Sequence, residues 1–350
     1  MIYFLTYPES EGHWQGMYNE AVTSELARCG LEYRKIVVDY FSPSCHTVLN
    51  EVQYIRSKVD DVWLLAWAQN PLIELIEHKP GLKCGHVHGL CCFPFEPAVL
   101  AGVDLKEKTR FGYYDCLFLN SRWSYENAMR AYPEHAHRFV ITGFPMDYGK
   151  LDPYRETPKE QDLVVFNQRF ALERAPSLVI ELARLLGQKG YRVRQLSGEP
   201  ESRIAARSPD LGRLLRAGRA VGLDFVFNAT KDEYHHRLAQ ASVVITTSLC
   251  DNLPVALLEA IYLGLVPAAP RSLCFPEFVH PDNLYAPFHL EQVVNLVVDR
   301  PVRPHAVTQF AKEKVMARYI AAFNRSGDGQ SDHVWAPVTS GRDNSIGWGK

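Results

Sequence analysis

Two acidic residues stand eight positions apart between two apolar runs, in a segment whose carboxylates could do chemistry. Asp251 follows the apolar run 242–248, and Glu259 precedes the apolar run 263–269. This order predicts a strand, a turn, a helix and a second strand, with Asp251 at the turn. Glu259 would lie about two helical turns further along, on nearly the same face.

The residues after Asp251 predict a helix tip that attracts anions. Asn252 can cap a helix and Pro254 suits its first turn, so free backbone N–H groups would face an anion beyond the strand. An acid beside such a tip is better placed to accept hydrogen bonds from sugar hydroxyls than to contact phosphate. The combination predicts a nucleotide-sugar site.

Two arginines form a second group of residues with chemical potential. Arg169 and Arg174 follow the apolar run 163–167 and precede the predicted helix 176–186. Their guanidinium groups can converge on one diphosphate, because each binds phosphate oxygens at two points and keeps its charge. Charge-assisted hydrogen bonds contribute roughly 1.5–3 kcal/mol each, against about 0.3–1 kcal/mol for a helix terminus. The arginines would therefore carry most of the stabilisation of a leaving diphosphate.

Both groups belong to a regular alternation of strands and helices. This alternation predicts an α/β fold with two doubly wound units in tandem, and ligands of such sheets lie beyond the carboxyl ends of the strands. We therefore expect the ligand in a cleft between the units. The predicted strands are 2–7, 34–38, 62–66, 84–88, 116–120, 139–142, 163–167, 192–196, 225–227, 242–248 and 263–269, and the clearest helices are 17–29, 176–186, 232–241 and 307–323.

The bulk composition indicates a globular protein of two domains. The chain has 350 residues, of which 47% are hydrophobic and 22% charged, and this length suffices for two cores. Its net charge of −2 argues against broad, charge-driven binding of nucleic acid. Eight cysteines spread along the chain indicate reduced thiols rather than a disulfide framework. No apolar run reaches the ~18 residues of a membrane span and no signal-like segment is present, so we expect a cytoplasmic location.

The second half of the chain resembles the retaining nucleotide-sugar glycosyltransferases of the GT-B fold, and in particular glycosyltransferase family 4. Arg169 and Arg174, followed by Ala-Pro, resemble the Arg and Lys pair with which that family holds the diphosphate. Ser248 to Glu259 resembles the family's Ser-x-x-Glu and second Glu. The chain departs from the family in having Arg174 in place of Lys and Asp251 in place of Glu.

The resemblance implies a role for each of these residues. Arg169 and Arg174 would hold the diphosphate, Asp251 would bind hydroxyls of the donor sugar, and Glu259 would bind the ribose. The donor phosphates would meet the backbone of the helix tip, formed by Asn252, Leu253, Pro254 and Val255.

The resemblance also divides the chain. It implies a Rossmann-like acceptor-side domain over 1–148, a linker over 149–161 and a nucleotide-sugar-binding domain over 162–303. A final helix within 304–325 would pack back toward the first domain. The tail 326–350 is rich in Ser, Gly, Asp and Asn, and we expect it to be mobile.

The first half carries fewer signals. Gly12 and Gly16 stand where the family has a glycine-rich loop after the first strand, and could let the backbone approach donor phosphate or acceptor, although a plain turn is the alternative. His88, at the end of the strand 84–88, matches an active-site histidine near the donor sugar. His86 faces the same side and is its rival, and a structural role is the alternative interpretation for both.

Two further residues are expected at the surface. Glu277 is predicted to be a loop carboxylate, although it could also reach the donor. His235 lies on the predicted amphipathic helix 232–241 and is expected to face solvent.

Together these features predict an enzyme, a hexosyltransferase that moves a sugar from a nucleotide-diphosphate donor to an acceptor hydroxyl with retention of anomeric configuration. No metal or cofactor is expected, because the two arginines would do what a magnesium ion does elsewhere. A small molecule or glycan is the favoured acceptor. The segments 88–94 and 115–121 resemble the subgroup that mannosylates queuosine in transfer RNA, so a nucleic-acid acceptor stays open. A sugar-nucleotide epimerase and a non-catalytic sugar-nucleotide-binding protein stay open as well.

Overall fold

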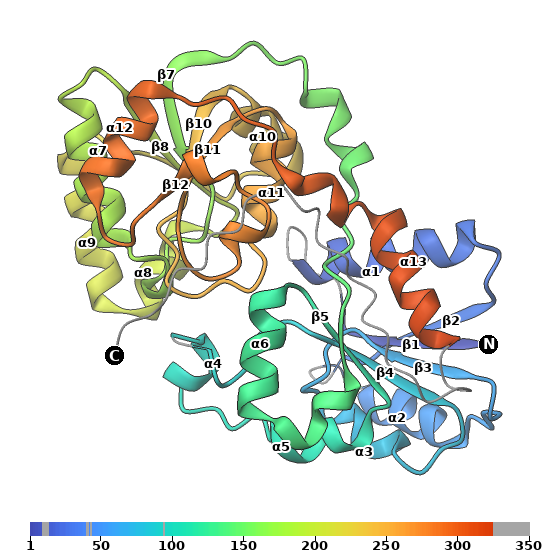
Figure 1. Cartoon of the computed structure of the whole chain (residues 1–350). Coiled ribbons are helices and arrows are strands. Elements are labelled where there is room, and N and C mark those ends of the chain that lie inside the picture. Colours follow the sequence, from blue (N-terminus) through green and yellow to red (C-terminus); the bar gives the residue numbers. More distant parts are fainter. Residues whose placement is uncertain (9–13, 40–41, 43, 94, 325–350) are drawn as a thin grey trace, which may run out of the picture.

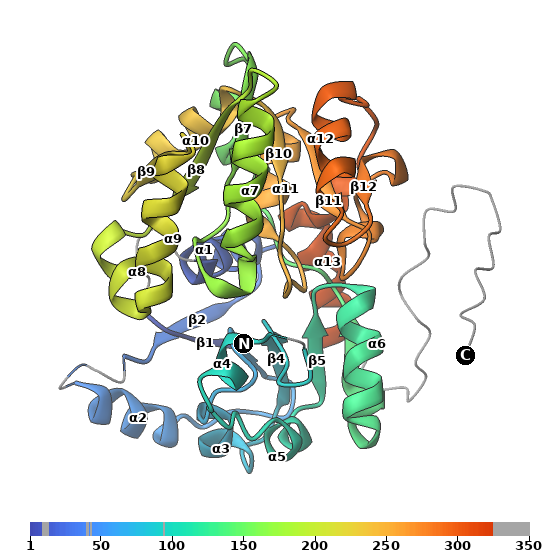
Figure 2. The same cartoon turned by 90° about the vertical axis from the view of Figure 1, so that its left-hand side faces the viewer.

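The computed structural model describes residues 1–8, 14–39, 42, 44–93 and 95–324. Within this part of the chain, the strands form two sheets of six parallel strands each, and the two sheets form the centres of two lobes (Figure 1). Figure 2 shows the same two lobes after a quarter turn, one above the other. The predicted α/β fold with two doubly wound units is confirmed.

The first sheet contains the strands of residues 2–141. They are β1 (Ile2–Thr6), β2 (Tyr33–Val37), β3 (Val62–Leu65), β4 (Leu82–Val87), β5 (Cys116–Leu119) and β6 (Phe139–Ile141), in the order β2-β1-β3-β4-β5-β6. The helices of this lobe are α1 (Trp14–Arg28), α2 (Cys45–Tyr54), α3 (Leu72–Ile76), α4 (Pro97–Leu100), α5 (Glu107–Arg110) and α6 (Arg122–Ala131).

The second sheet contains the strands of residues 160–285. They are β7 (Glu160–Phe166), β8 (Arg192–Ser197), β9 (Asp224–Phe227), β10 (Ala241–Ile245), β11 (Val266–Pro270) and β12 (Leu284–Tyr285), in the order β12-β11-β10-β7-β8-β9. The helices of this part are α7 (Pro176–Gly187), α8 (Glu201–Arg207), α9 (Pro209–Ala220), α10 (Lys231–Ala239), α11 (Val255–Tyr262) and α12 (Leu290–Asp299). Each predicted strand overlaps an observed one, and their ends differ by at most three residues.

The strands form because their apolar residues are buried on both faces, as parallel sheets require. In β7, Val164 and Phe166 face the helices α7 and α12, whereas Leu163 and Val165 belong to the core on the other face. The core that contains Leu163 and Val165 also includes Phe4 of the first lobe and Tyr148 of the connection between the lobes. A continuous apolar core therefore joins the two lobes.

The end of the described chain returns to the first lobe as helix α13 (Lys312–Phe323), red in Figure 1. Tyr319 of α13 lies 3.3 Å, oxygen to oxygen, from Tyr18 of α1. The single helix predicted over 307–323 is wrong in one respect, because Ala311 is extended and forms a parallel bridge with Met146. The Met146 N–H donates to the Phe310 carbonyl at 2.8 Å, so pairing with the connection between the lobes interrupts the helix.

Two predictions concern residues outside the described part of the chain. They are the mobile tail 326–350 and the role of Gly12 in a loop. Strand β7 begins at Glu160, inside the predicted linker. None of the helices in the described ranges combines the length and apolar character that crossing a bilayer requires.

Candidate functional site

The second lobe brings Arg174 and Asp251 together at the carboxyl end of its sheet. Arg174 ends the 3₁₀ turn Leu172–Arg174 after β7, and Asp251 follows the neighbouring strand β10. Arg174 Nη1 donates hydrogen bonds to Asp251 Oδ2, to Ser248 Oγ and, at 2.8 Å, to the Cys250 carbonyl. Both charged side chains are largely buried, so they form a partly desolvated ion pair where sheets of this kind bind ligands.

Further hydrogen bonds fix the turn that carries Arg174 against the loop after β10. Thr247 Oγ1 donates to the Arg174 carbonyl at 2.7 Å, and the Leu249 N–H donates to the Glu173 carbonyl at 2.9 Å. Ala175 has φ 48°, a left-handed conformation that residues other than glycine rarely adopt. The turn fixes the backbone of Arg174, and Asp251 holds its guanidinium group.

Arg169 lies on the open side of this ion pair. Its side chain is 53% exposed, and Nη2 donates to Glu173 Oε1 at 2.7 Å. Burial raises the pKa of Asp251, and the charges of Arg174 and Arg169 oppose that rise. Both guanidinium groups therefore act on one carboxylate. Arg174 is enclosed, whereas Arg169 is half-exposed and pairs with the largely buried Glu173, so an anion can approach Arg169 from the solvent side. We call Arg169, Arg174, Ser248 and Asp251 the arginine cluster.

The helix tip differs from the predicted cap. Helix α11 begins at Val255, with Pro254 before it and without a side-chain cap. Asn252 instead donates from Nδ2 to the His88 carbonyl in the first lobe. The Val255 N–H donates to the Leu253 carbonyl at 3.0 Å. The cap prediction is wrong because Asn252 lies three residues before the helix and bonds across the lobes.

The two candidate histidines have different surroundings. His86 is fully buried, and its Nδ1 lies 2.6 Å from Tyr319 Oη of α13. Burial lowers the pKa of His86 to about 3, so this ring is neutral and belongs to the core. His88 is half-buried, its ring centroid lies 4.7 Å from that of His86 in an edge-to-face arrangement, and its carbonyl accepts the Asn252 hydrogen bond. Of the two rivals, His88 is the one at the boundary between the lobes.

Glu259 lies in a second group of residues, against helix α10. Its carboxylate accepts from Tyr234 Oη at 3.3 Å and lies 3.4 Å from His235 Nε2 and 3.7 Å from Lys231 Nζ. Burial favours a higher pKa for Glu259, but Lys231, His235 and Tyr234 together hold it below its ordinary value. His235 is buried, so the prediction that it faces solvent is wrong. We call these four residues the Glu259 cluster.

The Glu259 cluster also lies at the boundary between the lobes. Lys231 Nζ is 3.7 Å from Met17 Sδ of α1 in the first lobe. Asn167, directly after β7, donates to Tyr234 Oη at 3.3 Å. The next residue, Gln168, donates to Thr247 Oγ1 at 3.1 Å. The Glu259 cluster and the arginine cluster therefore flank the end of β7, and both face the first lobe.

Of the two glycines predicted to lie in a loop, only Gly16 is among the described residues. Gly16 lies in the first turn of α1, which begins at Trp14, so Gly16 occupies a helical position and not a loop. The reason is that Tyr18, Val22 and Leu26 of α1 are buried on one face, which stabilises the helix as a whole.

Glu277 is a contact between the lobes, so the prediction of a surface carboxylate is wrong. Its Oε2 accepts the Arg122 N–H at 2.8 Å and its Oε1 accepts the Trp123 N–H at 2.7 Å, in the first turn of α6. Ser121 Oγ accepts the Ser124 N–H at 3.1 Å in the same turn. Burial raises the pKa of Glu277 to about 7, although the two N–H groups oppose that rise. Its partners are 154 and 155 residues away in the sequence, and no local pattern indicates them.

A second carboxylate that the sequence analysis missed faces the arginine cluster from the first lobe. Glu96 packs its carboxylate against Gly89, where an added Cβ would lie 2.6 Å from Oε2. Cys250 Sγ lies 3.9 Å from the same oxygen. Burial raises the pKa of Glu96, and the Arg169 charge opposes this. Within the described ranges, no three His, Cys, Asp or Glu side chains gather in a way that could hold a metal ion.

Comparison with known proteins identifies the fold. No protein-family model matches the chain. The sucrose-phosphate synthase of Thermosynechococcus elongatus superposes with a TM-score of 0.63 at 14% identity, covering 92% of this chain and 94% of that one. The lipopolysaccharide outer core galactosyltransferase WaaB superposes with a TM-score of 0.62 at 12% identity, covering 92% and 99%.

A third similar structure is a mutant of S. aureus TarM in complex with fondaparinux, α-GlcNAc-glycerol and UDP. It superposes with a TM-score of 0.60 at 13% identity, covering 79% of this chain, which spans 59% of the TarM chain. Together with the two parallel sheets, these similarities show that the chain has the GT-B fold, two Rossmann-like units side by side.

Proposed function

We propose that this protein is a retaining glycosyltransferase that moves a sugar from a nucleoside-diphosphate donor to an acceptor hydroxyl. One observation supports this most strongly. Arg174 and Asp251 form a largely buried ion pair at the carboxyl end of the second sheet, and Asn252, next in the chain, bonds to His88 of the other lobe. A cation for the diphosphate and a carboxylate for sugar hydroxyls are thus adjacent at the boundary between the lobes.

The proposed chemistry assigns each cluster one part of the donor. Arg174 and the exposed Arg169 bind the diphosphate, and Asp251 accepts hydrogen bonds from the sugar. Glu259 accepts hydrogen bonds from the ribose hydroxyls, since its cluster lies at the same sheet edge. The TarM mutant with a similar fold was solved with UDP, which supports a nucleotide donor for this chain.

In the transfer step, the bond between the sugar's anomeric carbon and the diphosphate oxygen breaks, and a bond to the acceptor oxygen forms. The acceptor proton passes to the leaving diphosphate on the same face, and the resemblance to family 4 supports this route to retention. Negative charge develops on the diphosphate, so preorganised cations beside it lower the barrier. We propose a small molecule or a glycan as the acceptor.

The test of this function is hydrolysis of a panel of nucleotide sugars without acceptor, combined with titration of UDP, GDP and ADP. Arg169→Ala should lower the hydrolysis rate by about 10²-fold or more, as expected for a group that stabilises developing charge, while weakening nucleotide binding far less. Arg192→Ala is the matched control, because Arg192 is also ion-paired and 54% exposed. It lies at the amino end of β8, whereas Arg169 follows the carboxyl end of β7.

Three results would contradict the proposal or its parts. Equal losses of rate and of nucleotide affinity in Arg169→Ala would contradict its role in the reaction. Nucleotide binding without hydrolysis of any donor would favour a non-catalytic sugar-nucleotide-binding protein. The absence of nucleotide binding would remove the proposal altogether.

A further inference from the structure

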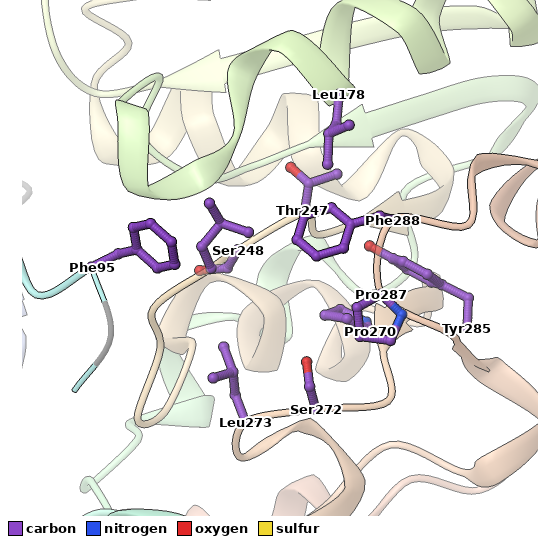
Figure 3. A pocket seen from close by; sticks show the side chains of 11 residues that line it. Phe95, Leu178, Thr247, Ser248, Pro270, Ser272, Leu273, Tyr285, Pro287 and Phe288 are labelled. Carbon is purple, nitrogen blue, oxygen red and sulfur yellow. The ribbon is translucent and has the colours of Figure 1, made fainter.

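A pocket of about 240 Å³ opens beside the arginine cluster (Figure 3). The loops after β10, β11 and β12 and the start of α7 line it, and Phe95 approaches from the first lobe. Ser248 and Leu249 line the pocket, and Ser248 Oγ also accepts the hydrogen bond from Arg174. The pocket and the arginine cluster therefore share one wall, the loop after β10.

Three of the four polar side chains that line the pocket are already paired with the protein, and Ser272 is the fourth. Thr247 Oγ1, Ser248 Oγ and Tyr285 Oη each donate to a backbone carbonyl, at 2.7, 3.0 and 2.6 Å. The remaining wall includes Leu178 and Pro287 and is largely apolar. A polar ligand would lose its water here and gain few partners beyond the Ser272 hydroxyl, whereas an apolar group leaves no hydrogen bond of its own unmade. The chemistry of the lining thus selects an apolar occupant.

The backbone around the pocket is held in an unusual conformation. Among the described residues, seven other than glycine have positive φ, and three of them line this pocket: Phe95 at 60°, Leu273 at 54° and Phe288 at 68°. Such residues persist where the surrounding structure holds them, and they gather at ligand sites. The side chains of Phe95 and Phe288 are 51% and 65% exposed, so two aromatic rings stand partly in water on the pocket wall.

We propose that this pocket binds the apolar part of the acceptor, an aromatic ring system or a short alkyl chain, and so presents the acceptor hydroxyl to the arginine cluster. This inference rests on the proposed function. The ribose, diphosphate and sugar of the donor do not suit the pocket, because they are polar or charged along their whole length. A nucleobase can stack on aromatic rings, and the nucleotide titrations of the pocket variants separate it from the acceptor. An apolar cavity of about 150 Å³ holds benzene, so this pocket has room for a bicyclic ring. The bonds made and broken are those of the transfer step above.

The test uses 2-naphthol and 1-hexanol as probes, titrated calorimetrically into the full chain without donor. Leu178→Trp fills the pocket from α7, outside the residues placed in catalysis or donor binding, and should weaken binding of the probes at least tenfold. Val298→Trp is the matched control, because Val298 is an exposed residue of α12 that does not line the pocket, and it should bind as the wild type does. Both variants should keep the wild-type affinity for UDP, GDP and ADP.

A second variant guards against misfolding of the first. Phe288→Ala removes a largely exposed ring and should weaken binding of the probes several-fold while leaving the unfolding midpoint unchanged. Transfer to 2-naphthol from whichever donor is hydrolysed should show a raised KM in both pocket variants and a nearly unchanged kcat.

The outcomes separate the pocket from the proposed function. Binding of a nucleoside diphosphate without saturable binding of either probe would overturn the pocket assignment and leave the transferase proposal standing. Equal binding of the probes by wild type and Leu178→Trp would do the same. Binding of the probes without binding of any nucleotide would overturn the proposed function and, with it, the acceptor role of the pocket.

Discussion

At the scale of single residues, the proposed site is an ion pair whose partners must separate when the donor binds. Arg174 directs its Nη1 toward Asp251, Ser248 and the Cys250 carbonyl. A diphosphate would take over bonds of Arg174, and sugar hydroxyls would take over bonds of Asp251. Each buried charge would thus exchange one satisfied state for another, and neither would be left unpaired.

Asp251→Ala should lower the free energy of unfolding by about 3–5 kcal/mol, because it leaves the Arg174 charge largely buried without its carboxylate. Urea unfolding measures this. The double variant Asp251→Leu with Arg174→Met should recover most of the loss, since it removes both charges together. A double variant as unstable as Asp251→Ala would show that the ion pair is not the cause.

Donor hydrolysis should be unchanged within about twofold by EDTA, because two arginines stay charged at every accessible pH and can neutralise the diphosphate. Adding Mg²⁺ should raise the rate of Arg169→Ala more than that of the wild type, since the ion can replace a missing cation. A loss of more than tenfold in EDTA that Mg²⁺ restores would contradict this assignment.

At the scale of helices and strands, local patterns predicted what depends on local burial. The runs that became β7 and β10 are apolar because both faces of a parallel sheet are covered, so their positions could be read from the sequence. Asn252 and Ala311 could not be placed in this way. Asn252 satisfies a local capping rule but bonds to His88, and Ala311 satisfies a helical period but pairs with Met146.

The same limit applies to the site residues. Arg174 and Asp251 could be anticipated, because the carboxyl ends of β7 and β10 meet whenever these strands are neighbours. Glu277 and Glu96 could not, because their partners come from distant segments and neither stands in a periodic pattern. Charged residues whose role depends on a partner in the other lobe leave no trace in local sequence.

The contact of Glu277 with α6 predicts a pH dependence of stability. The folded pKa is about 7 and the unfolded value is about 4.3, so the folded state binds this proton more tightly. Stability from this group is therefore full below about pH 4 and is lost as the pH rises toward 7. Between pH 5 and 8, the free energy of unfolding of the wild type should fall by roughly 2.5 kcal/mol relative to Glu277→Gln.

Urea unfolding of the wild type and Glu277→Gln at several pH values measures this difference. Arg122 and Glu126 also act on Glu277, and their effects are part of the raised pKa that this comparison measures. A difference that stays constant with pH, or grows in the opposite direction, would contradict the raised pKa.

At the scale of the whole molecule, the shared apolar core predicts that the two lobes unfold as one cooperative unit. Phe4 of the first lobe and Leu257 of the second belong to the same cluster of buried side chains. Tyr148 and Phe310, on the two connections between the lobes, belong to it as well. Loss of packing in one lobe therefore exposes apolar surface of the other.

Leu182→Ala in α7 should consequently lower the stability of both lobes. Leu182 is fully buried in the second lobe, and its truncation should cost about 2–5 kcal/mol. No tryptophan occurs between residues 160 and 303, whereas Trp63 lies in the first sheet. With Trp335 and Trp348 replaced by Phe, tryptophan fluorescence therefore follows the first lobe. Its urea midpoint should shift together with circular dichroism at 222 nm, as in a two-state transition.

The control for this experiment is Val298→Ala, an exposed position in the same lobe, which should leave both midpoints in place. A fluorescence midpoint unaffected by Leu182→Ala would show that the lobes unfold separately.

The return of α13 to the first lobe has a consequence for biosynthesis. Met316 and Tyr319 of α13 share a core with Tyr18 and Phe118 of the first lobe, and Tyr319 contacts His86 of β4. A ribosome delivers α13 after β12, so the first lobe waits for α13 with Phe118 and His86 uncovered, although α1 already packs on the same side of its sheet. The nascent chain thus passes through a stage in which the second lobe is complete and the first is not.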